Sequence, residues 1–119
     1  YWKMSKVKYA AGEIVDINLG RINTKEIQGH EQGKRRPCII VKALNELALI
    51  YIVPLTSKTP RNPNFYYVEI KNNALTSISY ALCHQIRTVS IERVAQKRGK
   101  ISSLDLNKIR FVLADLLDL

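Results

Sequence analysis

The apolar residues of this chain fall mostly into short runs that predict β-strands. Residues 11–19 alternate aliphatic side chains with Asp16 and Asn18, and this period of two predicts a half-buried strand. The runs Arg36–Ala43 and Leu47–Leu55 are richer in aliphatic residues and are separated by only three positions. They predict a hairpin that lies deep enough in the core to lose its polar alternation.

Further strands and two long loops are expected around this hairpin. Phe65–Ile70 and Ile78–Gln85 predict strands, and residues 85–89 continue either as a strand or as a tight bend. Residues 20–35 are polar without periodicity, and residues 58–63 contain two prolines, which do not fit a central strand. Both segments are expected to be loops, and loops of this length are commonly functional.

The C-terminal residues have the pattern of an amphipathic helix. Ser102 and Asp105 form an S-x-x-D capping pattern, and apolar residues then recur on one helical face at Leu106, Ile109, Leu113 and Leu116. Short strands followed by one helix predict an α+β fold that is mostly β, a small and strongly curved barrel or sandwich. The length of 119 residues predicts one domain, residues 1–119, with residues 1–10 as an N-terminal extension.

The net charge of the chain indicates which class of partner it binds. Lys and Arg number 19 against 10 Asp and Glu, and the net charge of +9 favours nucleic acid or an acidic protein as partner. The cluster Lys97-Arg98-Gly99-Lys100 is expected to form either a solvated turn or a patch that contacts a nucleic-acid backbone. No run approaches the ~18 apolar residues of a transmembrane helix, and a secretory signal pattern is absent, so we expect a cytoplasmic protein without a membrane partner.

The cysteines and histidines give little indication of a metal site. Cys38 and Cys83 lie inside apolar runs, which favours buried free thiols, although a disulfide stays open. Two Cys and two His at scattered spacing do not suit structural zinc, and no metal or other cofactor is expected. The chain opens on Tyr1 rather than on Met, and we expect further residues upstream.

Three polar groups adjoin predicted strands and could meet at one end of the sheet. The segment Gly29–Pro37 combines two glycines, His30 and three consecutive cations immediately before an apolar strand. Thr56-Ser57 follows a second strand, and His84–Thr88 follows a third. Together they offer imidazoles, guanidinium groups, hydroxyls and a carboxamide, but no paired carboxylates suited to Mg²⁺.

This inventory suits metal-free cleavage of RNA. When the 2′-hydroxyl is the nucleophile, cleavage needs a base, an acid for the leaving 5′-oxygen, and donors for the charge that builds on the phosphate. Histidine serves as base or acid near neutrality, and arginine gives bidentate phosphate contacts but is a poor base. The non-catalytic alternative is stacking of single-stranded nucleic acid on Tyr66, Tyr67 and Tyr80, although such tyrosines are more often core or sheet-face residues.

Several motifs in order along the chain resemble one family. They are Gly12-Glu13-Ile14-Val15, Gly29-His30-Glu31-Gln32-Gly33 through Arg36-Pro37, Val53-Pro54-Leu55-Thr56-Ser57, Val68-Glu69-Ile70 and Cys83-His84-Gln85-Ile86-Arg87-Thr88. With them the chain resembles toxins of the MazF/PemK type, from about Ala11 to the C-terminal helix. The resemblance implies an SH3-like barrel, a homodimer with an RNA groove, and metal-independent, sequence-specific cleavage of single-stranded RNA to a 2′,3′-cyclic phosphate and a 5′-hydroxyl. It also implies an acidic, MazE-like antitoxin in the RNA groove, through which a toxin–antitoxin complex could sit on operator DNA.

The resemblance also assigns roles to particular residues. Arg36 and Thr56 match the family's catalytic arginine and threonine. Residues expected to bind substrate in the same groove are Gly29, Glu31, Gln32, Lys34, Arg35, Ser57, Gln85 and Arg87. Arg87 has a structural ion pair or a dimer contact as its alternative role, and Glu31 has a loop hydrogen bond.

One position departs from the family. The residue after Cys83 is usually acidic there, and here it is His84. We therefore expect His84 to take part in proton transfer, together with His30, with phosphate, base or loop contacts as the alternatives. The departure keeps open a catalytically inactive module that binds RNA or the antitoxin. A gyrase poison of the same fold (CcdB-type) is a separate alternative, against which the Arg36–Pro37 and Thr56 motifs argue.

Overall fold

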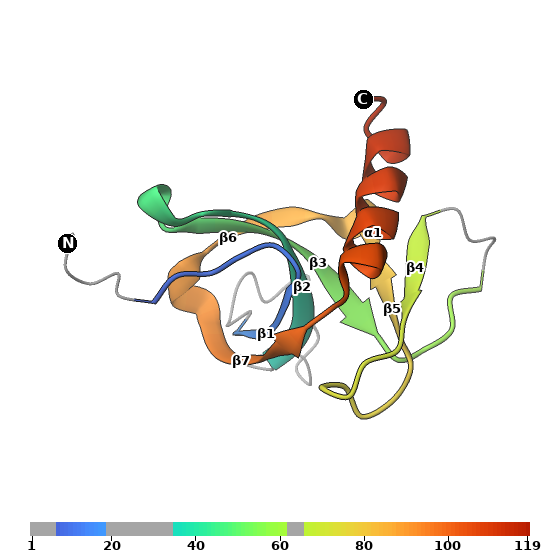
Figure 1. The fold of residues 1–119 in the computed structure, drawn as a ribbon, viewed down its shortest axis with the longest axis horizontal. Coiled ribbons are helices and arrows are strands. Elements are labelled where there is room, and N and C mark those ends of the chain that lie inside the picture. Colours follow the sequence, from blue (N-terminus) through green and yellow to red (C-terminus); the bar gives the residue numbers. More distant parts are fainter. Residues whose placement is uncertain (1–6, 19–34, 62–65) are drawn as a thin grey trace, which may run out of the picture.

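The fold is shown by a computed structural model that describes residues 7–18, 35–61 and 66–119 (Figure 1). Within these ranges the strands are β1 (Glu13–Asn18), β2 (Arg35–Leu44), β3 (Leu49–Thr56), β4 (Tyr67–Ile70), β5 (Ser79–Leu82), β6 (Arg87–Ser90) and β7 (Val94–Lys100). The α-helix α1 (Ser103–Leu116) ends the chain. Short 3₁₀ turns, η3 (Asn45–Leu47), η4 (Cys83–Gln85) and η5 (Ile91–Arg93), join consecutive strands.

The strands form one antiparallel sheet with β3 at its centre. Its order is β4-β5-β3-β2-β1-β7, and β6 also pairs with β3. One edge of β3 pairs with β2, whereas the other edge is shared, because β6 pairs with Leu49–Ile52 and β5 with Leu55–Thr56. The predicted α+β, mostly β class with a C-terminal helix is confirmed. The sheet curves strongly (Figure 1), but no ladder among the described residues joins β4 to β7, so it is not closed.

Both faces of the central strands are buried, which explains their nearly continuous apolar sequence. Ile14 and Ile39 face a core that includes Ile109 of α1. Their sequence neighbours Val15 and Ile40 face a second core on the other side of the sheet, and the rest of that core is Ile17, Cys38, Ile50, Ile52 and Val89. The predicted loss of polar alternation in the hairpin is confirmed.

The C-terminal helix begins and packs as its sequence predicts. The Ser102 hydroxyl accepts a hydrogen bond from the Asp105 backbone N–H at 3.1 Å, which caps the helix. Ile109 and Leu113 are buried, and Leu106 and Leu116 pack against the same core. Where the structure describes the chain, no helix has the length and apolar character needed to cross a membrane.

Two predictions about polar positions are wrong. Asp16 was expected on the solvent side of its strand, but it is only 5% exposed and pairs with Arg98. The basic cluster around Arg98 does not form the expected turn, because it lies within the edge strand β7, which pairs with β1, whereas its alternative as a patch that contacts a nucleic-acid backbone stays a prediction. Each error has the same cause, because the partner that satisfies the charge is distant in sequence.

The predicted strand Ile78–Gln85 is also too long. β5 ends at Leu82, and Cys83–Gln85 form the turn η4. The turn is needed because β5 and β6 pair with different stretches of the same edge of β3. Residues 87–90 then form the strand β6, which was one of the two forms expected there.

Candidate active site

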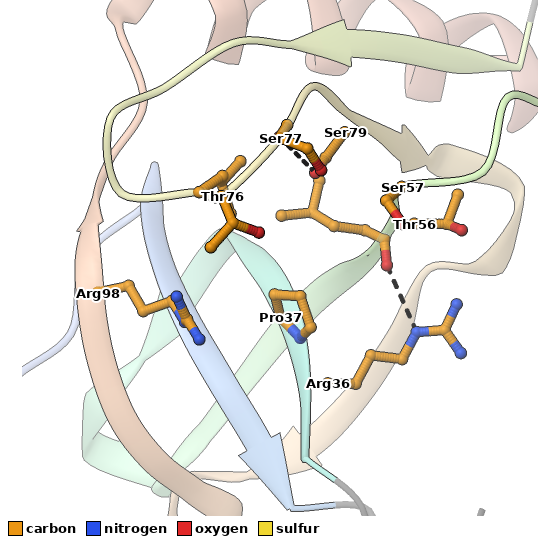
Figure 2. A pocket seen from close by; sticks show the side chains of 10 residues that line it. Arg36, Pro37, Thr56, Ser57, Thr76, Ser77, Ser79 and Arg98 are labelled. Carbon is orange, nitrogen blue, oxygen red and sulfur yellow. Dashed lines mark hydrogen bonds between the residues drawn. The ribbon is translucent and has the colours of Figure 1, made fainter.

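The ends of β2 and β3 border a cavity of about 350 Å³ (Figure 2). Arg36 is the second residue of β2 and Thr56 is the last residue of β3, and the antiparallel pairing of these strands places both at one end of the sheet. The loop between β4 and β5 forms the opposite wall. The residues that line the cavity are the two arginines Arg36 and Arg98, the hydroxyl-bearing Thr56, Ser57, Thr76, Ser77 and Ser79, and the apolar Pro37, Leu55 and Leu75.

Among the described residues, the Arg36 side chain makes one hydrogen bond. Its Nε donates a long hydrogen bond of 3.5 Å to the backbone carbonyl of Leu55 (Figure 2). Its two terminal nitrogens have no hydrogen-bond partner within the described part of the chain. They are therefore available for a bidentate contact with an anion such as a phosphate group.

Thr56 lines the same cavity and carries a hydroxyl group. Its Oγ1 accepts a hydrogen bond from the Lys58 backbone N–H at 3.2 Å. Because this bond occupies an acceptor position, the hydroxyl proton remains available for another partner. Ser57, which follows directly, is exposed in the same cavity.

Arg98 lines this cavity, and it was not among the predicted site residues. Its Nε donates to Asp16 Oδ1 at 2.8 Å, and its Nη1 donates to the Ala74 carbonyl at 3.3 Å. Figure 2 shows Arg98 and Arg36 on either side of Pro37. The charge cluster on β7 is visible in the sequence, but the sequence has no local signal that places Arg98 at the same cavity as Arg36.

The structure does not place His84, Gln85 and Arg87 in this cavity. His84 and Gln85 lie in η4, and Arg87 begins β6, on the edge of β3 opposite to β2. The strand β3 lies between Arg36 and η4, so at least two strand spacings, roughly 10 Å in the direction across the sheet, separate them. The exposed His84 ring packs edge-on against Tyr66, with 4.4 Å between ring centroids, and its Nε2 lies 3.4 Å from Gln85 Nε2.

Both cysteines of the chain are buried in the sheet region. Burial raises the pKa of Cys38 from 9.0 to about 12, and the positive charges of Arg36 and Arg87 partly oppose this rise. Burial also raises the pKa of Cys83 to about 12, and both cysteines are buried free thiols, as predicted.

The remaining predicted residues precede or open β2. Arg35 is the first residue of β2 and is exposed. The other five, Gly29, His30, Glu31, Gln32 and Lys34, lie outside the described residues.

A family model matches residues 10–117 of the chain and is described as PemK-like, MazF-like toxin of type II toxin–antitoxin system. The chain belongs to this toxin family. Solved MazF structures share its fold. The chain is 24% identical to MazF from Deinococcus radiodurans, with 96% of this chain and 100% of that chain covered and a TM-score of 0.73.

Two further structures contain antitoxins. An endoribonuclease from mycobacterial species, in complex with its cognate antitoxin, is 23% identical, with 93% of this chain and 96% of that chain covered and a TM-score of 0.69. A MazE–MazF complex from Deinococcus radiodurans gives 20% identity, coverage of 96% and 99%, and a TM-score of 0.74. None of the curated proteins matches this chain.

Proposed function

We propose that this MazF/PemK family member is a sequence-specific, metal-independent endoribonuclease that cleaves single-stranded RNA at the cavity bordered by the ends of β2 and β3. One observation carries the proposal. Arg36 and Thr56 line the same cavity from neighbouring strands, and each has donor groups without a partner in the described part of the chain. Two such donors, one of them cationic, suit a phosphate that gains charge during cleavage.

The cleavage is an internal transfer of the phosphate. The 2′-oxygen loses its proton and forms a bond to phosphorus, while the bond from phosphorus to the 5′-oxygen breaks and that oxygen gains a proton. The products are a 2′,3′-cyclic phosphate and a 5′-hydroxyl, so no water is consumed. Arg36 stabilises the charge on the non-bridging oxygens, and Thr56 donates to one of them.

The proton transfers are assigned to the histidines. His84 is exposed beside Tyr66, where substrate that extends across β3 from Arg36 can reach it. His30 is the second candidate. A pH–rate profile tests this assignment, since His84→Ala should remove one limb of the profile and His84→Asp should shift it. Rates and profiles that match the wild type in both variants would contradict a role for His84 in proton transfer.

The partners follow from charge and from the family. The net charge of +9 suits RNA, and it equally suits an acidic, MazE-like antitoxin that occupies the RNA groove. Two of the structurally similar toxins were solved in complexes with antitoxins, which supports such a partner for this chain. We also propose a homodimer in the cytoplasm, and a complex on operator DNA that forms through the antitoxin.

The direct test is incubation of the protein with a long single-stranded RNA in EDTA, followed by mapping of cut sites and end groups. We expect cuts at one short sequence, with a cyclic phosphate on one side and a 5′-hydroxyl on the other. Intact RNA that the protein nevertheless binds would contradict the proposal and favour an inactive binding module. Intact RNA together with inhibition of DNA gyrase would favour a gyrase poison.

A further inference from the structure

Half of the cavity has no role in the chemistry above. This half, the Arg98 pocket, is formed by Arg98, Thr76, Ser77, Leu75 and Pro37. We propose that the Arg98 pocket binds one nucleobase next to the cleaved bond and selects guanine. The inference rests on the proposed ribonuclease function, and it adds a residue that determines specificity.

The charge in the pocket favours a base over a second phosphate. The Asp16 carboxylate lies 2.8 Å from Arg98 Nε, so the pair has a net charge close to zero. A phosphate placed there would meet the field of this carboxylate together with that of the guanidinium. Arg36 has no carboxylate partner in the described part of the chain, so the phosphate is drawn to Arg36 and the neutral base to Arg98.

The donors left on Arg98 match an edge with two neighbouring acceptors. Nε and one Nη1 proton are used by Asp16 and Ala74, which leaves Nη2 and the second Nη1 proton. Figure 2 shows the guanidinium end of Arg98 directed toward Pro37. Guanine presents O6 and N7 side by side, and their bidentate contact with arginine is the commonest specific contact between a side chain and a base.

The walls of the pocket suit the rest of a base. Leu75 and Pro37 give apolar surface against which a ring can pack. The side chains of Thr76 and Ser77 are exposed, and neither hydroxyl has a hydrogen bond to another described residue. Hydroxyl groups both donate and accept, so they can complete the contacts of the base or of its ribose.

The loop that supplies these hydroxyls is fixed to β7. Asn72 Nδ2 donates to the Lys100 carbonyl at 3.0 Å, and Asn72 Oδ1 accepts from the Ala74 N–H at 2.8 Å. Ala74 also packs against Gly99 so closely that a Cβ on Gly99 would lie 2.7 Å from the Ala74 Cβ. Arg98 and the loop therefore form one preorganised unit, as a selective pocket requires.

The test is cleavage of a randomised single-stranded RNA library, with sequencing of the cut ends. The variants are Arg98→Lys, which keeps the charge opposite Asp16 but removes the planar pair of donors, and Thr76→Val. Arg110→Lys on the exposed face of α1 is the matched control, because it makes the same chemical change outside the cavity. Thermal denaturation of each variant reports whether the fold is kept.

For the wild type we expect guanine at one position beside the cut, enriched about tenfold over other bases. Arg98→Lys should lower this enrichment to about twofold, and Thr76→Val should lower it partly, while preferences at the other positions and the Arg110→Lys control stay unchanged. Cleavage with wild-type preferences in both pocket variants would overturn the pocket assignment alone. A library left uncut by the wild type would overturn the ribonuclease function, and the assignment with it.

Discussion

The ion pair between Asp16 and Arg98 makes a strong test of how the cavity is built. Asp16→Asn keeps the size of the side chain and removes its charge. The side chains of Asp16 and Arg98 are 7% and 35% exposed, so the pair is neither fully buried nor a surface contact. The matched comparison is Glu13→Gln, since Glu13 pairs with Lys97 on the same two strands at 3.2 Å, with exposures of 18% and 41%.

The expected cost follows from these exposures. Loss of one partner from a fully buried pair costs roughly 3–5 kcal/mol. Because water reaches a third of the Arg98 side chain and an amide oxygen still accepts a hydrogen bond, we expect about 1–2 kcal/mol for Asp16→Asn. An exposed pair contributes about 0–1 kcal/mol, so Glu13→Gln should cost about 0.5 kcal/mol.

Thermal denaturation followed by circular dichroism measures both variants. For a domain of this size about 4 °C of Tm corresponds to 1 kcal/mol, so Tm should fall by about 4–8 °C in Asp16→Asn and by about 2 °C in Glu13→Gln. Asp16→Asn should also weaken the base preference, because Arg98 loses the contact that orients it. Equal losses of Tm in the two variants, with base preference intact, would refute the idea that this pair orients the pocket.

Further predictions concern the cavity, its loop and the buried thiols. Thr56→Val should lower kcat for RNA cleavage about a hundredfold while Thr56→Ser keeps most activity, and equal rates in the two variants would show that the hydroxyl is not used. Gly99→Ala should displace the loop at Ala74 and weaken base preference more than total cleavage in the library assay, and an unchanged preference would mean that the loop position is not needed. Cys38 and Cys83 should resist alkylation at pH 8 until the protein unfolds, and fast reaction of the native protein would contradict their burial. Both thiols hold their protons more tightly in the folded state, so the free energy of unfolding should fall as pH rises from about 9 toward 12, which denaturant titrations at several pH values would measure.

Local patterns predicted most of the fold. The cap at Ser102 and the apolar face of the helix depend on residues three or four positions apart, so the sequence displays them directly. The hairpin of β2 and β3 was equally visible, because two buried faces leave a run with few polar residues. This hairpin also predicts that Arg36 and Thr56 lie close together, because the start of β2 and the end of β3 form its open end.

Contacts between distant segments could not be predicted in this way. Asp16 and Arg98 are 82 positions apart in the sequence. The local sequence around each residue does not indicate that the two form an ion pair. The strands β5 and β6 pair with different stretches of the same edge of β3, and this pairing also has no local signal in the sequence. It places His84 in the turn between these two strands, on the other side of β3 from Arg36. The sequence grouped His84 with the phosphate-binding residues, whereas in the structure β3 lies between His84 and Arg36.

The most direct test of the ribonuclease function compares Arg36→Ala with Arg35→Ala on one short RNA substrate in EDTA. Arg36 lines the cavity, whereas its exposed neighbour Arg35 does not, so the pair separates catalysis from general attraction of the RNA backbone. We predict that kcat/KM falls at least about a hundredfold in Arg36→Ala with little change in Tm, and only a few-fold in Arg35→Ala. Full cleavage by Arg36→Ala, with the same cut sites as the wild type, would contradict the assignment of the active site to this cavity.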